Sequence, residues 1–480
     1  PSAFGPKFRA MGRLVIASNR TATPGEPRAG GLAVALADAL AERGGGLWFG
    51  WSGKVARGHS GELHRTTSNG IDYVTIDLSR EDYEGYYNGF SNRTLWPLLH
   101  FRLDLVDYNA MTQAAYRGVN ALFAEKLAKE IRDEDIVWIH DYHLLPLAQE
   151  LRRRGVRARL GFFLHVPFPS ADIIAGLPHH EKTFGALSAY DLVGFQTERD
   201  LERFQDYIRL FRGGQVAGRG ELREQDGRRF RASAFPIGID AGGLARLAQN
   251  AVRIPAVKRL QASLNGRALA IGVDRLDYSK GLPERFRAFE RFLERHDDQH
   301  GRVTYLQIAP VSRGELDAYA ELRQELEQLA GNINGRFATL DWAPMQILTR
   351  GFTRKALAGI YRAARICMVT PLRDGMNLVA KEYVAAQDPE DPGVLILSRF
   401  AGAKAELDAA LIVNPYSSDD VARAVSRAIA AHRAHRISDA ELADSDLILA
   451  MTSRHRDALH KALDTGVGLA IDTLQKHPAV

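Results

Sequence analysis

The chain has 480 residues, of which 45% are hydrophobic and 25% are charged. This length favours two domains, and the composition is that of a globular protein, with neither a disorder signature nor an apolar run long enough for a membrane helix. The net charge of +5 comes from 63 Lys and Arg interleaved with 58 Asp and Glu, which indicates neither a nucleic acid nor a membrane as partner.

The start of the chain and its cysteine content bear on where the protein works. Residues 1–10 lack the apolar core of a secretory signal, and Met11 is typical of a native start behind a short leader. The single cysteine, Cys367, lies in an apolar run, which favours a buried, inert thiol and excludes an intrachain disulfide. We therefore expect a cytoplasmic protein.

Short apolar runs alternate with segments of helical periodicity along the chain. In the first half we expect strands at Leu14–Ser18, Tyr73–Leu78, Ile136–His140, Leu160–Val166 and Leu192–Gln196, and helices at Leu32–Arg43 and Gln113–Arg132. In the second half we expect strands at Ala268–Val273, Val303–Ile308, Ile366–Thr370, Val394–Leu397 and Leu411–Val413, and helices at Pro283–His296, Gly314–Gly331 and Asn377–Gln387. Continuous apolar strands separated by helices predict an α/β protein with parallel, doubly wound sheets covered on both faces.

The domain boundary is expected near residue 240. The stretch 212–229, polar and rich in glycine, is the weakest part of the pattern, and it separates the two groups of strands. We expect an N-terminal domain at 12–240, a C-terminal domain at 241–444 and a helical segment at 445–480. Two such sheets facing each other leave a cleft at the carboxyl ends of their strands, where ligands bind in open α/β folds.

One strand end in the second half has the groups needed to hold a sugar nucleotide. Residues 369–382 have the pattern of a strand end, a tight loop and a helix start, so the N–H groups of Met376 to Leu378 would carry the positive end of the helix dipole. Asp374 can accept hydrogen bonds from sugar hydroxyls, and Glu382 can hold a ribose diol. The alternative is an ordinary capped helix with a surface acid.

A second loop, at residues 273–283, supplies cations. Arg275 and Lys280 follow a strand and precede a helix that Pro283 opens, so both side chains can reach one diphosphate. The alternative is a pair of surface cations in ordinary salt bridges.

The first strand of the chain ends at Arg20, and Gly30 and Gly31 open the next helix. These glycines do not form the G-x-G-x-x-G fingerprint of dinucleotide-binding proteins, and Gly44–Gly46 precede an expected strand rather than follow one. Gly30 and Gly31 would let the backbone approach a phosphate closely, although a plain turn is the alternative.

Aromatic residues gather at three places in the first half, 48–51, 86–87 and 96. Their flat faces suit the apolar faces of sugars, and a Tyr hydroxyl can bond to a phosphate, whereas a core role is the alternative for each ring.

The segment 140–143, His-Asp-Tyr-His, has a weak resemblance to a metal-binding pattern. A strand alternates its faces, so His140, Asp141 and His143 would not converge without a sharp turn, and we do not expect a metal. Asp141, just past a strand end, is better interpreted as an acceptor of sugar hydroxyls. His165 ends another strand at the cleft edge, with a buried structural histidine as the alternative.

Together these segments resemble the trehalose-6-phosphate synthases, the retaining transferases of glycosyltransferase family 20. The likeness runs from Arg13 to Asn414 and includes, in order, the segments 18–20, 30–32, 48–51, 86–88, 140–143, 165–169, 274–281, 312–314 and 373–378. It implies the GT-B fold: two facing Rossmann-like domains with the active site in the cleft between them. It also implies that the C-terminal helical segment returns to the N-terminal domain.

The resemblance implies roles for individual residues. The donor-binding residues would be Gly31, His165, Arg275, Lys280, Phe352, Asp374, Gly375, Met376, Asn377, Leu378, Val379 and Glu382. The acceptor-binding residues would be Arg20, Trp51, Tyr87, Trp96, Asp141 and Arg313. The residues closest to the chemistry would be Arg275, Lys280, Asp141 and His165.

The implied reaction joins glucose from UDP-glucose to glucose 6-phosphate, with no metal or other cofactor, in a homo-oligomeric enzyme. Alternatives are a transferase with another phosphorylated acceptor, such as glycerol 3-phosphate, and a non-catalytic sugar sensor. A nicotinamide-dependent dehydrogenase is a third alternative, because doubly wound sheets host both classes. The missing fingerprint after the first strand speaks against the dehydrogenase.

Overall fold

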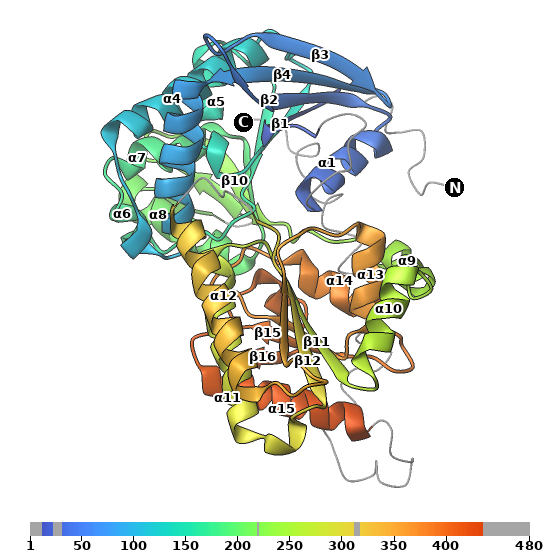
Figure 1. The fold of residues 1–480 in the computed structure, drawn as a ribbon. Helices are drawn as coiled ribbons and strands as arrows, with labels where there is room; N and C mark the ends of the chain where they lie inside the picture. The colour runs from blue at the N-terminus through green and yellow to red at the C-terminus, as the bar shows by residue number, and fades with distance from the viewer. Residues whose placement is uncertain (1–11, 23–30, 218–219, 312–316, 435–480) are drawn as a thin grey trace. The chain divides into compact units, whose positions relative to one another are not determined.

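Two sheets organise the chain in the computed structural model (Figure 1). The structure describes residues 12–22, 31–217, 220–311 and 317–434. The chain divides between Pro236 and Ile237 into two compact units, here called the N-terminal unit and the C-terminal unit, and each is described by itself. The expected helical segment 445–480 lies outside the described residues.

The N-terminal unit is built on a ten-stranded sheet of order β3-β4-β2-β1-β5-β6-β7-β10-β9-β8. The strands from β4 to β10 in this order are parallel, whereas β3, β9 and β8 pair antiparallel at the two edges. The bounds are β1 Leu14–Arg20, β2 Gly46–Ala56, β3 Leu63–Ser68, β4 Ile71–Ser79, β5 Ile136–His140, β6 Arg159–Phe163, β7 Leu192–Phe195, β8 Gln215–Val216, β9 Glu221–Arg223 and β10 Arg229–Ala234.

Helices cover both faces of this sheet. On one face α1 (Gly31–Glu42) buries Leu36 and Leu40 against Ile16, Trp48 and Trp138 of the strands. The other face carries α4 (Ala110–Leu127), α5 (Leu147–Arg153), α6 (Ala171–Ala175), α7 (His180–Thr183) and α8 (Glu198–Arg212) (Figure 1). Between β4 and α4 lie α2 (Arg80–Asp82), the π-helical segment η2 (Tyr83–Leu95) and α3 (Trp96–Leu99). Because both faces are covered, the central strands are mostly apolar, as in residues 14–17 of β1 and 136–139 of β5.

The C-terminal unit contains a six-stranded, all-parallel sheet of order β13-β12-β11-β14-β15-β16. This is the 3-2-1-4-5-6 order of dinucleotide-binding sheets. The bounds are β11 Ala268–Val273, β12 Val303–Ile308, β13 Met345–Leu348, β14 Ile366–Val369, β15 Val394–Ser398 and β16 Leu411–Val413.

The helices of the C-terminal unit form two layers (Figure 1). One layer contains α9 (Ala241–Ala251), α10 (Pro255–Leu264), α13 (Arg354–Ala363) and α14 (Leu378–Ala386). The other contains α11 (Leu282–Arg295), α12 (Asp317–Phe337) and α15 (Ser418–Ala434). In the core beneath the second layer, Phe286, Phe289 and Phe292 of α11 pack with Leu326 of α12 and Val425 of α15.

The parallel strands expected from the sequence are present, with ends that differ by a few residues. Strand β6 ends at Phe163 instead of Val166, because the N–H of His165 donates to the side chain of Asp141 and not to a neighbouring strand. The stretch 212–229, in which no strand was expected, contributes the edge strands β8 and β9 and the first residue of β10. These edge strands are short and polar, so they lack the apolar signal of the central strands.

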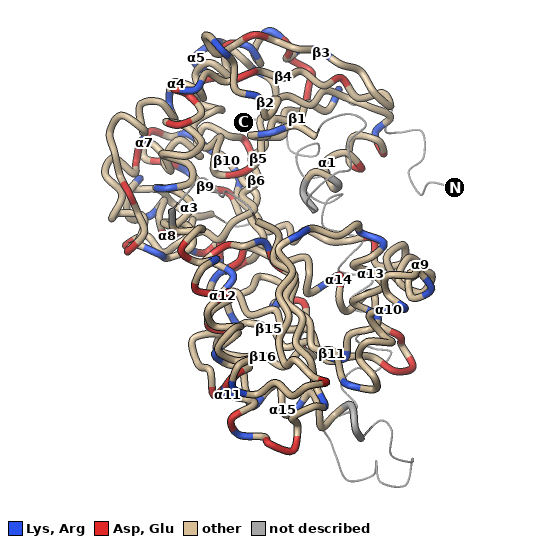
Figure 2. Tube along the Cα trace, viewed as in Figure 1, with Lys and Arg blue, Asp and Glu red and all other residues tan. Residues whose placement is uncertain are grey.

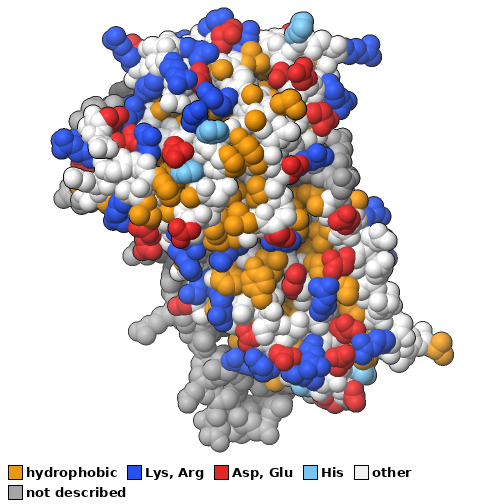
Figure 3. All heavy atoms as spheres, turned by 90° about the vertical axis from the view of Figure 1, so that its left-hand side faces the viewer, with side chains coloured by type: hydrophobic (Ala, Val, Ile, Leu, Met, Phe, Trp, Pro, Cys, Tyr) orange, Lys and Arg blue, Asp and Glu red, His pale blue; other side chains and the backbone are white. Residues whose placement is uncertain are grey.

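Charges of both signs are interleaved along the chain in each unit (Figure 2). On the face that Figure 3 shows, Lys and Arg side chains are likewise interspersed with Asp and Glu. None of the helices formed by the described residues is long and apolar enough to cross a membrane.

Candidate active site

In the C-terminal unit, the predicted donor residues lie at the point where the strand order reverses. Strand β11 has β12 on one side and β14 on the other, so successive connections run in opposite directions from this pair. Ligands of open parallel sheets bind outside the carboxyl ends of such a pair. The loop 274–281 follows β11 and the loop 370–377 follows β14, which places Arg275, Lys280 and Asp374 at this point.

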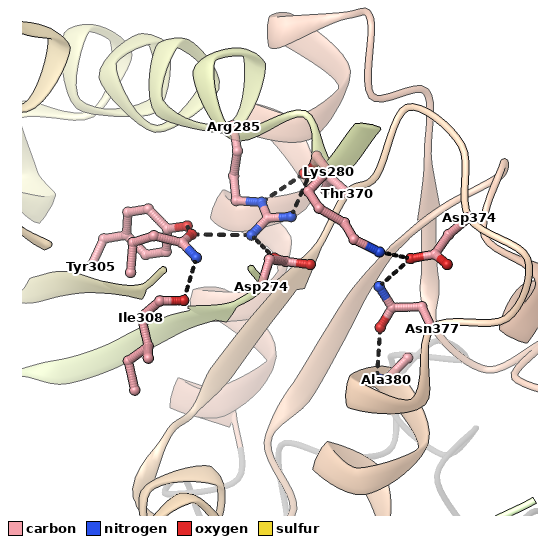
Figure 4. Close-up of polar contacts among 10 residues, drawn as sticks. Asp274, Lys280, Arg285, Tyr305, Ile308, Thr370, Asp374, Asn377 and Ala380 are labelled. Carbon is pink, nitrogen blue, oxygen red and sulfur yellow. Dashed lines mark hydrogen bonds and ion pairs between the residues drawn. The ribbon is translucent and has the colours of Figure 1, made fainter. Parts of the chain in front are cut away.

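An ion pair joins these two loops (Figure 4). Nζ of Lys280 lies 2.5 Å from Oδ2 of Asp374, and the two side chains are only 13% and 14% exposed. The same carboxylate oxygen accepts a 3.0 Å hydrogen bond from Nδ2 of Asn377, whose own Oδ1 caps α14 by accepting from the N–H of Ala380. Arg275 is exposed and follows the buried Asp274. The structure therefore brings together Lys280, Asp374 and Asn377, three of the predicted donor residues.

The loop before α14 is held by close backbone contacts. A Cβ added to Gly402 would lie 1.8 Å from the carbonyl oxygen of Gly375, so only glycine permits this approach. The N–H of Ala403 donates to the carbonyl of Met376 at 2.8 Å, and that of Leu372 donates to the carbonyl of Ser279 at 2.8 Å. Because α14 begins at Leu378, the positive end of its dipole lies at this fixed loop, where it favours an anion.

Glu382 lies one turn into α14. Burial raises the pKa of its carboxyl group, and the cation of Arg354 opposes that rise. Arg354 is the first residue of α13, which packs against α14, and Phe352 lies just before it beneath the guanidinium of Arg350 at 5.3 Å. Leu378 and Val379 are both partly exposed. Glu382, Leu378 and Val379 thus share the first turns of one helix.

The N-terminal unit has a second reversal point, between β1 and β5. Arg20 ends β1, and Asp141 directly follows β5. The Arg20 guanidinium lies over Gly53 of β2, because a Cβ built on that glycine would come within 2.7 Å of its carbon and nitrogen atoms. Gly53 therefore leaves room for an exposed cation at the carboxyl end of β1.

A sharp turn, which was not expected from the sequence, is present at Asp141. This residue has φ 74° and ψ 166°, a conformation that costs a non-glycine residue about 1–3 kcal/mol and that clusters at functional sites. Its N–H donates to the carbonyl of Phe163 at 2.8 Å, and its Oδ1 accepts from the N–H of His165 at 3.3 Å. Asp141 and His165, predicted from separate segments, are therefore neighbours.

His165 is held by two polar partners. Its Nδ1 lies 3.4 Å from the amide nitrogen of Gln196, which donates to it, and its Nε2 lies 3.0 Å from Nδ1 of the fully buried His140. Burial lowers the pKa of His165 to about 3 and also lowers the pKa of His140. Both rings are therefore neutral near pH 7, and His165 donates its single proton to His140.

The three aromatic residues that the resemblance assigns to the acceptor, Trp51, Tyr87 and Trp96, belong to one chain of ring contacts. Trp51 lies 5.5 Å from both Tyr83 and Tyr87, and Tyr87 stacks on His143 at 5.8 Å with 13° between the planes. The chain continues through Tyr142, whose ring centroid lies 3.9 Å from that of His143 and 5.7 Å from that of Trp96. We call these six rings the aromatic cluster: Trp51, Tyr83, Tyr87, Tyr142, His143 and Trp96.

The members of the aromatic cluster differ in exposure. Trp51 and Trp96 are each 5% exposed, as the core alternative expected, whereas Tyr87 is half-buried. His143 stacks with Tyr87 while His140 pairs with His165, so the two histidines of the His-Asp-Tyr-His segment have different neighbours. In the ranges that the structure describes, no three His, Cys, Asp or Glu residues are grouped as a metal would require.

Two predicted site residues lie at the edge of or outside the described ranges, and two other residues near the site were not predicted. Gly31 is the first residue of α1, whereas Arg313 lies outside the described residues. The sequence interpretation did not select Tyr83 or the buried Arg285, which lies beneath Lys280. Arg285 carried a usable signal, because it occupies the apolar face of its helix between Leu282 and Phe289.

The chain matches the profile of glycosyltransferase family 20 over residues 11–452. The chain belongs to this family. A trehalose-6-phosphate synthase of Enterobacter sp. (strain 638) is 50% identical over 430 residues, which are 89% of this chain and 90% of the relative.

Solved structures of trehalose-phosphate synthases agree with this family assignment. An α,α-trehalose-phosphate synthase (UDP-forming) from Burkholderia xenovorans, in complex with glucose-6-phosphate, has a TM-score of 0.89 and 46% identity, covering 97% of this chain and 99% of the other. The E. coli protein bound with UDP-2-fluoro glucose has a TM-score of 0.87 and 44% identity, with the same shares covered. The likeness confirms the predicted family and its architecture of two doubly wound sheets of the GT-B kind.

Proposed function

We propose that the chain transfers glucose from UDP-glucose to glucose 6-phosphate, with retention at the anomeric carbon, forming α,α-trehalose 6-phosphate and UDP. The observation that carries the proposal is the near full-length likeness to a UDP-forming synthase whose structure contains glucose-6-phosphate. The likeness to a synthase bound with a fluorinated UDP-glucose supports the same donor. Both reversal points in this chain carry the polar groups that such ligands need.

The donor is assigned to the C-terminal unit. Arg275 and Lys280 would bind the diphosphate, and Asp374 with the backbone N–H groups of residues 375–379 would hold the glucose hydroxyls. Glu382 would hold the ribose, and Phe352 with Leu378 would lie beside the uracil. The charged Lys280–Asp374 pair and the helix dipole at Leu378 support this assignment. Gly31 and His165 of the N-terminal unit complete the proposed donor contacts.

The acceptor is assigned to the N-terminal unit. Arg20, Tyr87 and Arg313 would bind the phosphate of glucose 6-phosphate, because a dianion requires cations and hydroxyl donors. Trp51 and Trp96 with Asp141 would contact its sugar ring. The exposed Arg20, the strained Asp141 and the ring contacts of Tyr87 support this part of the proposal.

The difficult event is cleavage of the anomeric C–O bond, during which negative charge grows on the leaving phosphate. Arg275 and Lys280 stabilise that charge more in the transition state than in the ground state, which is what accelerates the step. These two cations supply the neutralisation that a metal ion provides in other enzymes, so the proposal includes no metal.

For retention we favour attack on the same face that the leaving group departs from. The leaving phosphate oxygen takes the proton of the acceptor hydroxyl, so no enzyme base and no glucosyl-enzyme adduct are required. A retaining glycosidase instead forms a covalent adduct with a carboxylate. Trapping a glucosyl adduct on any carboxylate of this chain, by rapid quenching and peptide mass spectrometry, would overturn the same-face route.

The proposal also includes a cytoplasmic location, with which the single cysteine agrees, and a homo-oligomeric state. The oligomeric state is measured by light scattering of the purified chain.

The decisive experiment mixes the purified chain with UDP-, ADP- or GDP-glucose and glucose 6-phosphate, and measures nucleotide release together with the disaccharide phosphate. We expect UDP release that depends on glucose 6-phosphate, with an α,α-linked product by NMR. Glycerol 3-phosphate and unphosphorylated glucose serve as control acceptors. A faster reaction with glycerol 3-phosphate, or no nucleotide release from any donor, would refute the proposal.

A further inference from the structure

A single buried arginine lies beneath the loops that carry the proposed donor cations. Arg285 belongs to α11, and its side chain has no exposed surface. It occupies the same helix face as Leu282, Phe286 and Phe289, which are also fully buried. Burying a guanidinium is expensive unless its N–H groups are bonded to acceptors. Its partners therefore indicate what it does.

The guanidinium donates to four acceptors from three parts of the unit (Figure 4). Nε donates to Oγ1 of Thr370 at 2.8 Å, and one terminal nitrogen donates to Oδ2 of Asp274 at 2.7 Å and to Oε1 of Gln307 at 3.1 Å. The other terminal nitrogen donates to the carbonyl of Lys280 at 3.2 Å. Tyr305 also donates its hydroxyl to Gln307 Oε1, at 2.5 Å.

Two of these acceptors belong to the loop after β11 that carries the proposed donor cations, and a third begins the loop after β14. Asp274 directly precedes Arg275, and the accepting carbonyl belongs to Lys280 itself. Thr370 directly follows β14 and begins the loop that leads to Asp374. A guanidinium is planar and rigid, so it holds all of these acceptors in one fixed arrangement. Because Arg285 fixes the ends of both loops, the Lys280–Asp374 pair joins two loops whose positions are already set.

The strand beside this network leaves space for it. A Cβ added to Gly272 of β11 would lie 2.4 Å from Gln307 Oε1, 2.5 Å from the Tyr305 hydroxyl and 2.7 Å from the Arg285 guanidinium. Stability alone does not account for such a network, because a buried ion pair is often replaced by apolar residues without loss of stability. A role in positioning the neighbouring loops does explain why the network is present.

We propose that Arg285 is a positioning residue for the nucleotide-sugar donor: it contacts no substrate, but sets the loops that present Arg275, Lys280 and Asp374. This inference rests on the proposed function. Small displacements of catalytic groups cost about 100-fold in rate, and loss of the residues that support them typically costs about 10- to 100-fold in activity. Substitution of Arg285 should therefore impair the binding and use of the donor and leave the binding of the acceptor almost unchanged.

The test compares Arg285→Met, Arg285→Lys and Thr370→Val with the control Arg287→Met. Arg287 lies on the same helix, is exposed and pairs with Glu325 on the surface. Thr370→Val keeps the side-chain volume and removes one acceptor, so it remains informative if Arg285→Met does not fold. For each variant we measure melting by circular dichroism, kcat, KM for both substrates and Kd for UDP by calorimetry.

We expect Arg285→Met to lower kcat/KM for UDP-glucose by about 10- to 100-fold and to weaken UDP binding, with KM for glucose 6-phosphate changed less than about twofold. Thr370→Val should show a smaller loss of the same kind, and Arg285→Lys should recover part of the activity. Arg287→Met should match the wild type. Folded variants with wild-type kcat and UDP affinity would overturn the proposal, as would a loss that only follows the folded fraction. Failure of the wild type to release UDP would instead refute the proposed function.

Discussion

The two units reverse their strand order in the same way, yet the residues at the two reversal points differ in kind. At the C-terminal point, opposite charges are paired with little exposure: Lys280 with Asp374, and Arg285 with Asp274. At the N-terminal point, neutral imidazoles and stacked rings lie beside Arg20, an exposed cation, and the carboxylate of Asp141 accepts from the backbone N–H of His165 and not from a cation. Because the sheets are alike, the difference comes from the loops and not from the fold.

This difference has an energetic consequence. A buried ion that loses its partner is left uncompensated, which costs several kcal/mol, whereas a ring that loses one neighbour keeps its other contacts. Substitutions at the C-terminal point should therefore abolish the chemical step. Substitutions at the N-terminal point should instead weaken substrate binding by an amount that depends on the contacts removed. The following predictions test this contrast, beginning with the largest effect.

The largest loss is expected for Arg275→Ala. Removing one donor that stabilises transition-state charge costs about 2.7–4 kcal/mol, which is roughly 100- to 1000-fold in rate. We expect kcat for UDP release to fall by that factor while KM for glucose 6-phosphate hardly changes. Steady-state kinetics with each substrate varied in turn check this.

The matched control is Arg302→Ala, which removes an exposed arginine just before β12, at the opposite end of the same sheet. It should leave both constants unchanged. A loss of less than tenfold for Arg275→Ala would show that this cation does not stabilise the departing nucleotide.

Local patterns in the sequence were enough to select the cations of the C-terminal reversal point and the central strands. Arg275 and Lys280 are found from a strand, a short loop and a helix opened by Pro283, and short apolar runs such as Ala268–Val273 mark the central strands. Edge strands such as β8 and β9 were missed, because two or three polar residues carry no such pattern. Their pairing depends on neighbours far along the chain, which no local window contains.

Long-range partners explain what was missed at the site as well. Nothing near Asp141 in the sequence indicates that its carboxylate accepts from the backbone of His165, or that His140 pairs with the same ring. Arg285 was visible as a charge on an apolar helix face, but its acceptors come from β12, the loop after β14 and the loop after β11. The residue types were predictable, whereas their pairing required the fold.

The second prediction concerns the exposed cation of the N-terminal point. A charge-assisted hydrogen bond contributes about 1.5–3 kcal/mol, so Arg20→Ala should raise KM for glucose 6-phosphate by roughly 10- to 100-fold. Its kcat at saturating acceptor should fall much less than that of Arg275→Ala. Arg117→Ala, which removes an exposed arginine of α4, is the control. Unchanged saturation by glucose 6-phosphate would remove Arg20 from the acceptor site.

The third prediction uses the neutral histidines. The pKa of His165 is about 3 in the folded chain against an ordinary value of 6.5, so between these values the unfolded chain binds the extra proton. Stability is therefore complete above pH 6.5 and declines as the pH falls toward 3. His165 alone should lower the free energy of unfolding by about 2 kcal/mol between pH 8 and pH 5.

Urea denaturation of the wild type and of His165→Gln at both pH values measures this contribution. The variant should lose about 2 kcal/mol less than the wild type over that interval, because glutamine does not titrate. His59→Gln, at an exposed position of the same unit, is the control and should follow the wild type. Equal pH dependence in His165→Gln and the wild type would mean that the His140–His165 pair accepts a proton without penalty.

The smallest effect is expected within the aromatic cluster. Tyr87 and Tyr83 are adjacent, stacked at 5.6 Å and both half-buried, but only Tyr87 is assigned to the acceptor phosphate. Tyr87→Phe keeps the ring contacts with Trp51 and His143 and removes one hydroxyl, worth about 0.5–1.5 kcal/mol, so KM for glucose 6-phosphate should rise roughly 2- to 10-fold at constant kcat. Tyr83→Phe is the matched control and should leave KM unchanged. Equal values of KM for the two variants would make Tyr87 a packing ring, and the acceptor phosphate would then depend on cationic side chains, as the donor diphosphate does.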